Sequence, residues 1–429
     1  MNGQTSDSSS EPQCLETKLT KMLQNVESPK IDGLDMQCIY RVPERLSETN
    51  PKAYTPRIVS IGPFHKECDT EKEGSVFKSI EDLKVNYLKA FLNRTQIPMR
   101  TFVDKLQALE DKIRSCYAVL IKYNSDEFLE MILIDACFII ELFLRWFTRQ
   151  DLMGKDPLLL KPWMRKQICY DLILLENQLP FFVLEELYEL ARMNREFPSF
   201  LRISFNYLKH VKHVEWCPSE SPKHFTDLLR TCIIPPSKII DLGAQEECNE
   251  IKHVYSASQL QEAGLKFKVS LSGLFDLIYS SEGVLKMPIL NITGDTETFF
   301  RNIVAFEHCH FSGNQKIITQ YLKILDFLID TEQDVKVLVD KKIIAYCMGD
   351  ANAVARMVNS LTTNLVMPPF NPKYFSLCKS LNDFYGNPRN KYKAILRHEY
   401  LNNPWKIVSI VAATVLLVLT LIQTIFSII

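Results

Sequence analysis

Two clusters of histidine and cysteine have the residue types of a metal or nucleophile site. His210, His213 and Cys217 follow the spacing H-x-x-H-x-x-x-C, which on one helical face offers zinc ligands. No fourth ligand with a matched spacing accompanies them, so they are weak metal candidates. In 308–310 a cysteine stands between two histidines, but neighbours on a helix point about 100° apart and do not share one metal. We expect this second cluster to have a structural role at a helix end.

A third cluster is acidic and lies in two apolar runs. Paired carboxylates in apolar surroundings acquire raised pKa values, and enzymes use such groups for acid–base chemistry. The alternative is structural, because buried backbone groups need hydrogen-bond partners. We favour this alternative, in which the side chains cap helices and bind the backbone of a proline-rich segment. The cluster consists of Asp135, Glu141, Asp171, Glu176, Asn177 and Gln178.

The common catalytic signatures are absent from the sequence. It has no Walker A loop, no dinucleotide-binding glycine motif, no G-x-S-x-G, no H-E-x-x-H and no kinase set. The net charge of −1 provides no basic field for nucleic acid. The 12 cysteines form no C-x-x-C pair, which is typical of a reducing compartment. We therefore expect no catalytic residue, no cofactor and no nucleic-acid partner.

The order of elements predicts a mainly α fold with a small β insert. Residues 1–37 are expected to form a polar, disordered arm, and 38–400 a large helical domain. Four prolines mark 39–65 as an extended segment that lies across the core. Residues 212–255 are expected to be a long loop. Apolar periodicity predicts helices over 76–92, 99–123, 128–147, 171–190 with a kink or break at Pro180, 296–309, 315–329, 331–339 and 351–361, the last capped by Asp350, and strands over 265–269 and 284–292.

The apolar run 128–147 is long enough to resemble a membrane span. It contains ionisable residues, of which each costs about 3 kcal/mol in hydrocarbon. We therefore expect a buried helix of a soluble domain. Glu141 and Arg145 within it are four residues apart, a spacing common for pairs on a helix surface.

The last 23 residues, 407–429, contain no charge, no glycine and no proline. As a helix they would span roughly 34 Å, enough to cross a bilayer core. Trp405 and Lys406 precede the span and are suited to the membrane interface, so 401–429 is predicted to be a juxtamembrane segment and a single-pass anchor. Basic residues lie on the N-terminal side of the span, which predicts a tail anchor with the domain on the cytosolic side. The membrane is expected to be the plasma membrane or an internal membrane.

Small and polar residues form a stripe along this predicted anchor. Their spacing of three and four residues places them on one helical face, where small residues permit close packing and Gln423 offers an interhelical hydrogen bond. We hypothesise that the helix associates with itself or with another membrane helix. The alternative is a lone anchor. The stripe consists of Ser409, Ala413, Leu416, Thr420, Gln423 and Ser427.

The proline-rich, acidic and anchor segments together resemble a plant family, domain of unknown function 247. The resemblance covers about 38–429, with small departures at Phe64, where the family usually has Tyr, and at 66–67, where His-Gly is common. The matching motifs are IYRVP at 39–43, YTPRIVSIGPFH at 54–65, DACFIIELF at 135–143, DLILLENQLPF at 171–181, FFRNIVAFEHC at 299–309 and NPW at 403–405.

The resemblance implies a helical plant protein with a C-terminal transmembrane helix and no assigned activity. Some relatives are associated with self-recognition in pollen–stigma incompatibility. The leading interpretation is a non-enzymatic module that binds a protein partner or takes part in signalling. The alternatives are a membrane-tethered enzyme, metal-dependent through the 210–217 cluster, and a recognition protein that faces the cell exterior with glycans on Asn93 or Asn291.

Overall fold

The computed structural model confirms a mainly α fold with two small sheets. Most of the arm predicted at 1–37 and the segment between the domain and the C-terminal helix lie outside the described residues. The structure describes residues 15, 17–21, 23, 36–66, 76–148, 158, 161–192, 197–209, 211, 216–234, 251–271, 273–367, 369–397 and 404–428.

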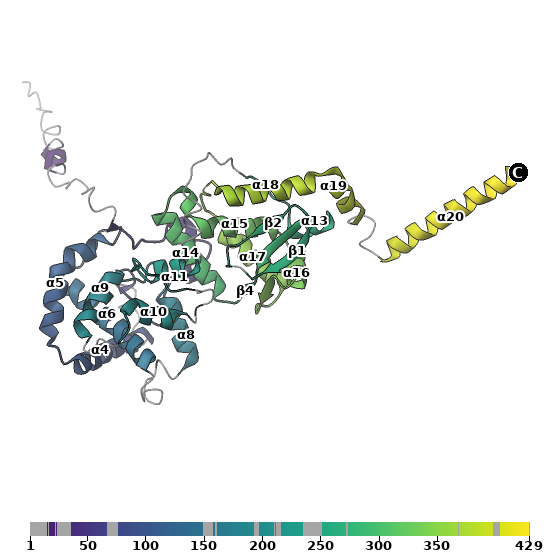
Figure 1. Cartoon of the computed structure of the whole chain (residues 1–429). Helices are drawn as coiled ribbons and strands as arrows, with labels where there is room; N and C mark the ends of the chain where they lie inside the picture. The colour runs from purple at the N-terminus through teal and green to yellow at the C-terminus, as the bar shows by residue number, and fades with distance from the viewer. Residues whose placement is uncertain are drawn as a thin grey trace, which may run out of the picture.

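The helix α6 (Ser125–Thr148) is the centre of the first half of the domain. It contacts α4 (Val76–Thr95), α5 (Met99–Ser115), α9 (Phe181–Ala191) and α10 (Phe200–Leu208), which surround it (Figure 1). Apolar residues on every side of α6 are buried, which is the pattern of a helix at the centre of a bundle. The prediction of a buried helix here is confirmed.

The second half of the domain packs helices against two small sheets. In the larger sheet β3 lies between β1, to which it is parallel, and β2, to which it is antiparallel. In the smaller sheet β4 and β5 are parallel. The strands are β1 (Lys266–Ser270), β2 (Ile278–Ser280), β3 (Val284–Pro288), β4 (Leu290–Ile292) and β5 (Ile344–Tyr346).

The remaining elements complete the two halves and lead to the C-terminal helix. In the first half they are α2 (Glu44–Ser47), η2 (Pro51–Ala53), α8 (Pro162–Asp171) and α11 (Phe225–Ile233). In the second half they are α13 (Ala257–Glu262), α14 (Thr296–His310), η4 (Gly313–Gln315), α15 (Ile317–Leu328), α16 (Glu332–Asp340), α17 (Ala351–Leu361), α18 (Pro372–Gly386), α19 (Pro388–Ile395) and α20 (Pro404–Ile428).

A buried ion pair joins the two halves. Glu307 on α14 accepts from Nε of Arg230 on α11 at 3.0 Å, and both side chains are buried. The same carboxylate accepts from the backbone N–H groups of Ile318 and Thr319 at the start of α15, at 3.2 and 2.8 Å. Because every partner is satisfied, this buried charge fixes three helices relative to one another.

The proline-rich segment crosses the core in an extended, irregular conformation, as predicted. Ile39, Val59 and Ile61 are fully buried. Ile39 forms an isolated parallel bridge with Tyr117, which follows α5. Apart from α2 and η2, the described part of this segment has no regular structure, so its backbone groups need other partners.

Several predicted boundaries were wrong. The helix expected over 99–123 ends at Ser115, since the chain then turns to meet the proline-rich segment. For the helix expected over 171–190, the predicted break at Pro180 is confirmed, since α9 begins at Phe181. The part before it was wrong, because α8 ends at Asp171 and residues 172–180 form turns and irregular backbone. The long loop expected over 212–255 contains α11, which His224 caps through its side chain.

The strand predictions were partly right. The expected strand over 284–292 is two strands, β3 and β4, in different sheets, with Ile289 between them. β2 was missed, since its three residues lie at a sheet edge and are not buried. Within α17 both boundaries match the prediction, and the Asp350 carboxylate accepts from the N–H of Ala353 as the predicted cap.

The helix α20 contains the predicted membrane span. Its residues Trp405–Ser427 form 23 residues with a mean hydropathy of 2.4, and none of this stretch is buried against the domain. By length and composition it is a candidate membrane-spanning helix. Among the described residues no other helix meets the same criteria.

Candidate functional site: a buried polar network and an adjoining groove

The Asp171 carboxylate, at the end of α8, holds the middle of the proline-rich segment. It accepts from the backbone N–H groups of Arg57 at 3.1 Å, Ile58 at 2.7 Å and Val59 at 3.0 Å. Burial raises the pKa of Asp171, and the N–H donors oppose that rise. A carboxylate whose oxygens are occupied by backbone donors is a structural acceptor and not a proton carrier.

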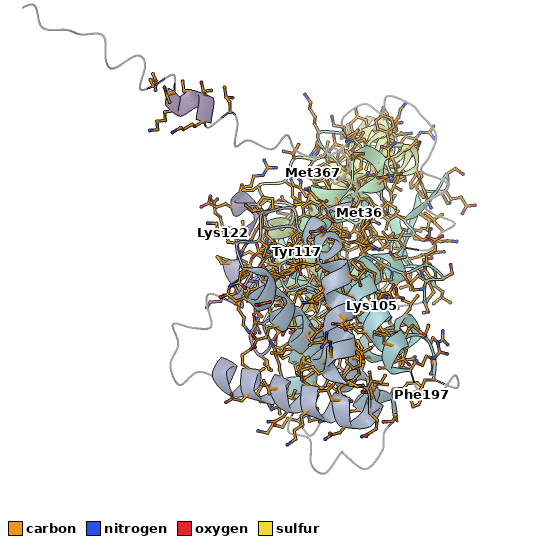
Figure 2. The ribbon with its side chains drawn as sticks, turned by 90° about the vertical axis from the view of Figure 1, so that its left-hand side faces the viewer. Met36, Lys105, Tyr117, Lys122, Phe197 and Met367 are labelled. Carbon is orange, nitrogen blue, oxygen red and sulfur yellow. The ribbon has the colours of Figure 1, made fainter. Side chains whose placement is uncertain are left out.

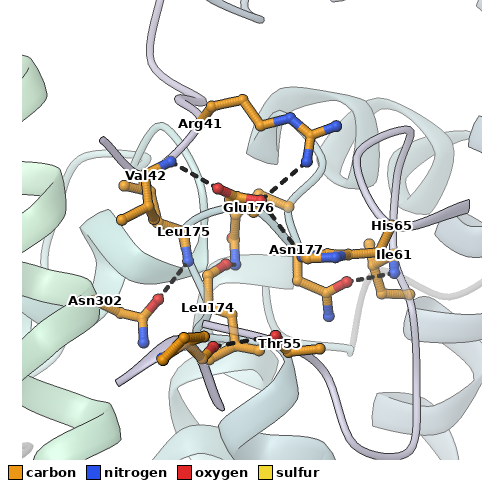
Figure 3. A network of polar contacts seen from close by, with 12 residues as sticks. Arg41, Val42, Thr55, Ile61, His65, Leu174, Leu175, Glu176, Asn177 and Asn302 are labelled. Atoms are coloured by element: carbon orange, nitrogen blue, oxygen red, sulfur yellow. Dashed lines mark hydrogen bonds and ion pairs between the residues drawn. The ribbon is translucent and has the colours of Figure 1, made fainter. Parts of the chain in front are cut away.

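Asn177 continues the same function in the turn after α8. Its Oδ1 atom accepts from the N–H of Ile61 at 2.6 Å (Figure 3). Its Nδ2 group donates to the carbonyl oxygens of Val59 and Asp171 at 3.0 and 2.8 Å. One amide side chain therefore replaces the strand partner that this part of the segment lacks.

A buried lysine completes the network beneath Gly62. Asp135 on α6 accepts from the Gly62 N–H at 2.8 Å and from Nζ of Lys84 on α4 at 2.7 Å. Burial opposes the charge on Lys84, but Asp135 and Glu81 outweigh it and raise the pKa of its ammonium. Gly62 has φ +70°, and a Cβ there would lie 2.7 Å from the Gln178 carbonyl oxygen, so the position requires glycine.

Glu176 binds the start of the segment near the surface. It accepts from the Val42 N–H at 2.7 Å and from the Arg41 guanidinium at 3.1 Å (Figure 3). His65 lies 3.8 Å from the same carboxylate, but burial lowers the pKa of His65 to about 4. The imidazole is therefore uncharged at neutral pH and forms no ion pair there.

The structural interpretation of the acidic cluster is thus confirmed for the residues that contact this segment. One detail was wrong. Glu141 is not part of a surface pair, because its side chain is buried and accepts from two arginines, Arg145 on its own helix and Arg94 on α4. Gln178 donates to carbonyl oxygens of the preceding turn and accepts from the N–H of Phe225.

The 308–310 cluster lies at the end of α14, as expected, and its histidines have different partners. The ring of His308 lies 2.7 Å from the Arg45 guanidinium. The ring of His310 lies 2.8 Å from the Tyr40 hydroxyl and stacks on Phe306. Both contacts bind the proline-rich segment to α14.

The structure describes only one of the three weak metal candidates. His210 and His213 lie outside the described residues, and Cys217 is half-buried against the core. Within the described ranges, no group of three or more histidine, cysteine or acidic residues could hold a metal ion. A metal site formed by these three residues therefore remains a prediction.

The predicted membrane residues lie along α20. The hydroxyls of Ser409 and Thr420 donate to the carbonyl oxygens four residues earlier, at 2.9 and 2.8 Å. Among the described residues, the Gln423 amide has no hydrogen-bond partner. Ala413 and Ser427 lie on the same face by their spacing, and Trp405 is exposed at the start of the helix.

Comparison with known proteins identifies the family. The family model described as "Plant protein of unknown function", domain of unknown function 247, matches residues 39–419. The chain belongs to this family. It is 30% identical over 420 residues to the UPF0481 protein At3g47200 of Arabidopsis thaliana, covering 91% of this chain and 86% of that protein.

A second relative in the same plant extends the comparison. The putative UPF0481 protein At3g02645 of Arabidopsis thaliana is 24% identical over 486 residues, covering 90% of this chain and 89% of that protein. No solved structure matches the chain. The expected membership of the domain of unknown function 247 family is confirmed, and the names of these relatives assign no activity.

In this member of the family, a surface groove adjoins the polar network. Its volume is about 290 Å³, and it lies between the proline-rich segment and the loop after α5. Leu120 in that loop is 89% exposed, and Lys122 is also exposed at this surface (Figure 2). The groove is lined by Arg41, Pro63, Phe64, Val119, Leu120, Ile121, Lys122 and Tyr123.

Contacts of two arginine side chains fix both walls of the groove. The Arg114 guanidinium donates to the carbonyl oxygens of Ile121 and Tyr123 at 3.2 and 3.0 Å, which fixes the loop. On the other wall the Arg41 guanidinium lies 4.3 Å from the centre of the Phe64 ring. The groove is therefore preformed and carries cations beside exposed apolar side chains.

Sequence reasoning missed this groove and several buried polar residues, among them Lys84 and His224. Lys84 had a detectable signal, because it is four residues from both Ile80 and Leu88 and so shares their buried face. His224 had none, since only the folded chain brings it to the carbonyl oxygen of Cys38, 2.9 Å from its Nε2 atom. The groove combines residues roughly 55 to 80 positions apart in the sequence, which no local pattern connects.

Replacement of Asp171 tests the network directly. In Asp171→Ala the buried N–H groups of Ile58 and Val59 and the partly buried N–H group of Arg57 lose their acceptor, and each buried group left without one costs about 1–3 kcal/mol. We expect the free energy of unfolding, measured by urea denaturation, to fall by about 3 kcal/mol or more. Asp171→Asn retains one acceptor oxygen, so its free energy of unfolding should lie between those of Asp171→Ala and the natural protein. Glu332→Ala, at an exposed carboxylate, is the control, and an Asp171→Ala protein as stable as this control would contradict the role.

The buried His224 predicts an acid-sensitive fold. Its Nδ1 atom accepts from the Asp227 N–H, and burial lowers its pKa to about 3, against an ordinary value near 6.5. Below about pH 6.5 the unfolded chain takes up a proton that the folded chain does not. The free energy of unfolding should therefore fall by about 1.4 kcal/mol per pH unit from this histidine, from pH 6.5 towards pH 3.

The variant His224→Asn isolates this contribution. Asparagine retains an acceptor for the α11 cap but does not titrate, so the variant should be less stable at pH 7 and lose less stability on acidification. The measurement is the slope of the unfolding free energy between pH 6 and pH 4.5. Equal slopes in the variant and the natural protein would contradict the prediction.

Proposed function

We propose that this protein is a membrane-anchored, non-enzymatic interaction module. Its helical domain binds a segment of a partner protein in the groove beside the proline-rich segment, and α20 anchors the domain to a bilayer. The observation that carries the proposal is the preformed groove, with Leu120 exposed beside the cations Arg41 and Lys122. An acidic partner segment with a large apolar side chain fits these charges and this apolar surface.

The occupied carboxylates support a role without catalysis. Asp135 and Asp171 accept from buried backbone N–H groups, and Glu307 does the same between helices. A general base needs an oxygen atom available to its substrate. Asp135 and Asp171 instead hold the segment that forms one wall of the groove, and Glu307 holds α11 and α15 against α14.

The charge around the anchor supports a cytosolic domain. Lys391, Lys393 and Arg397 are exposed on the N-terminal side of α20, and Lys406 lies at its first turn. Positive residues beside a membrane span favour the cytosolic side. A partner in signalling would then be a cytosolic protein or the cytosolic part of a membrane protein.

The stripe on α20 supports pairing within the membrane. Thr420 satisfies its own hydroxyl within the helix, which leaves the amide of Gln423 as the strongest polar group on this face. In hydrocarbon an amide gains from a partner on a second helix. We infer that this face associates with another copy of α20 or with the membrane helix of a partner.

Peptide selection tests the groove. The full chain in lipid nanodiscs should select, from a phage library of short peptides, sequences with acidic residues and one large apolar residue. Leu120→Ser should weaken binding of such a peptide by about tenfold or more, because the peptide loses an apolar contact. Lys122→Glu should weaken it on the order of tenfold by charge repulsion.

The matched control is Lys89→Glu, which makes the same charge change at an exposed position on α4. It should leave the affinity unchanged. Equal weakening by Lys89→Glu and Lys122→Glu would mean that the whole domain's charge attracts the peptide, and the groove proposal would fail.

Association of α20 is tested with a transmembrane reporter that measures helix pairing in a bacterial membrane. Gln423→Leu combined with Thr420→Leu should reduce association by about 1 kcal/mol, or roughly fivefold, as an interhelical hydrogen bond is lost. Thr414→Leu removes a hydroxyl outside the stripe and serves as the control. An unchanged signal in the double variant would exclude this face.

A further inference from the structure

The short helix α19 (Pro388–Ile395) exposes apolar residues at the end of the domain nearest in sequence to α20. Tyr392 is 73% exposed, and Ile395 and Leu396 are 40% and 50% exposed. Ala394 is buried, and it marks the face that packs towards α13. The opposite face of α19 is therefore uncovered and apolar, in a domain whose apolar residues are otherwise largely buried.

Basic residues border this apolar face on both sides. With 3.6 residues per turn, Tyr392 lies between Ile395 and Leu396 on the exposed side of the helix. Around the helix axis, Lys391 borders the apolar face on the side of Ile395. Arg389 and then Lys393 border it on the side of Leu396. An apolar strip between cations is the pattern of a helix that lies in the plane of a membrane interface.

The charge around α19 is positive, unlike the net charge of the whole chain. The whole protein has a net charge of −1, yet residues 384–397 contain four basic residues and no acidic one. Arg397 donates to the carbonyl oxygens of Gln261 and Glu262 at 2.9 and 3.3 Å, which fixes the end of α19 against α13. The remaining three cations are Arg389, Lys391 and Lys393, all exposed.

The connection to α20 limits how far α19 is from the bilayer. Eight residues separate Ile395 from Pro404, where α20 begins (Figure 1). Nine steps of fully extended chain cover at most about 30 Å, so α19 stays within that distance of the membrane surface. At physiological salt a charge is screened over about 8 Å, so the cations contribute only when the helix lies against the headgroups.

We propose that α19 is a membrane-surface element that binds the anionic headgroups of phospholipids, with Tyr392, Ile395 and Leu396 inserted among the acyl chains. The proposal rests on the membrane anchoring by α20 proposed above and adds a second contact with a particular lipid class. The binding fixes the distance and tilt of the domain relative to the bilayer. The anchor then provides attachment, and α19 provides orientation.

The test uses the full chain reconstituted in vesicles of phosphatidylcholine that contain a trace of photoreactive phosphatidylserine or photoreactive phosphatidylcholine. After illumination, mass spectrometry measures the lipid attached to the peptide that contains residues 388–397. Each cation near an anionic surface contributes roughly fivefold, so labelling by phosphatidylserine should exceed labelling by phosphatidylcholine by about tenfold or more. High salt should reduce the preference, because exposed charges are screened.

A charge-matched pair of variants locates the effect. Combined replacement of Arg389, Lys391 and Lys393 by Gln should abolish the preference for phosphatidylserine. The control, Lys52→Gln with Lys89→Gln and Arg100→Gln, removes three exposed cations from the first half of the domain and should retain it.

Alkaline carbonate extraction on the same vesicles separates the two proposals. A chain that carbonate strips from the vesicles overturns the α20 anchor and the α19 surface with it. A chain that resists carbonate but is labelled equally by both lipids overturns the α19 surface alone. Preference for phosphatidylserine that persists in the α19 variant would also overturn it.

Discussion

The fold depends on one constraint, the burial of an irregular backbone. Residues 57–62 cross the core without a strand partner, and a buried N–H without an acceptor costs about 1–3 kcal/mol. Side chains from two helices and a turn therefore replace the missing strand. Asp171, Asn177 and Asp135 each accept from this backbone, and Lys84 balances the charge of the last. The positions of α4, α6 and α8 follow from this requirement.

This constraint explains why acidic residues in apolar runs are not evidence for catalysis here. Burial of a charged carboxylate costs free energy unless several hydrogen-bond donors surround it, and the backbone of the proline-rich segment provides those donors. The same arrangement holds the exposed Arg41 and the buried Phe64 in the wall of the groove, through Glu176 and the turn at Gly62. Structural demand in the core and the shape of the proposed binding surface therefore have one physical origin.

Sequence reasoning predicted the parts of the structure that local physics determines. The period of apolar residues located about half of the helices, and Asp350 located the start of α17, because capping acts within four residues. It also predicted the role of the acidic cluster, since a proline-rich buried segment needs acceptors. It did not predict which acceptor meets which N–H, because partners such as Asp171 and Ile58 are 113 residues apart. The turns at 172–180 were missed for a related reason, since the side chains of Asn177 and Gln178 bind nearby carbonyl oxygens that a helix would otherwise use.

The order of these contacts along the chain has a consequence for synthesis. The proline-rich segment leaves the ribosome early, but Asn177 follows Ile61 by 116 residues, and Asn302, which binds the carbonyl oxygen of Ala53, follows it by 249. At roughly 5–20 residues per second, Lys84 follows within a few seconds, but the segment waits on the order of ten seconds for Asn177 and longer for Asn302. Throughout that interval its apolar residues and its unpaired backbone are open to chaperones and to other nascent chains. The arrangement that stabilises the finished domain thus makes its N-terminal part the longest-exposed region during translation.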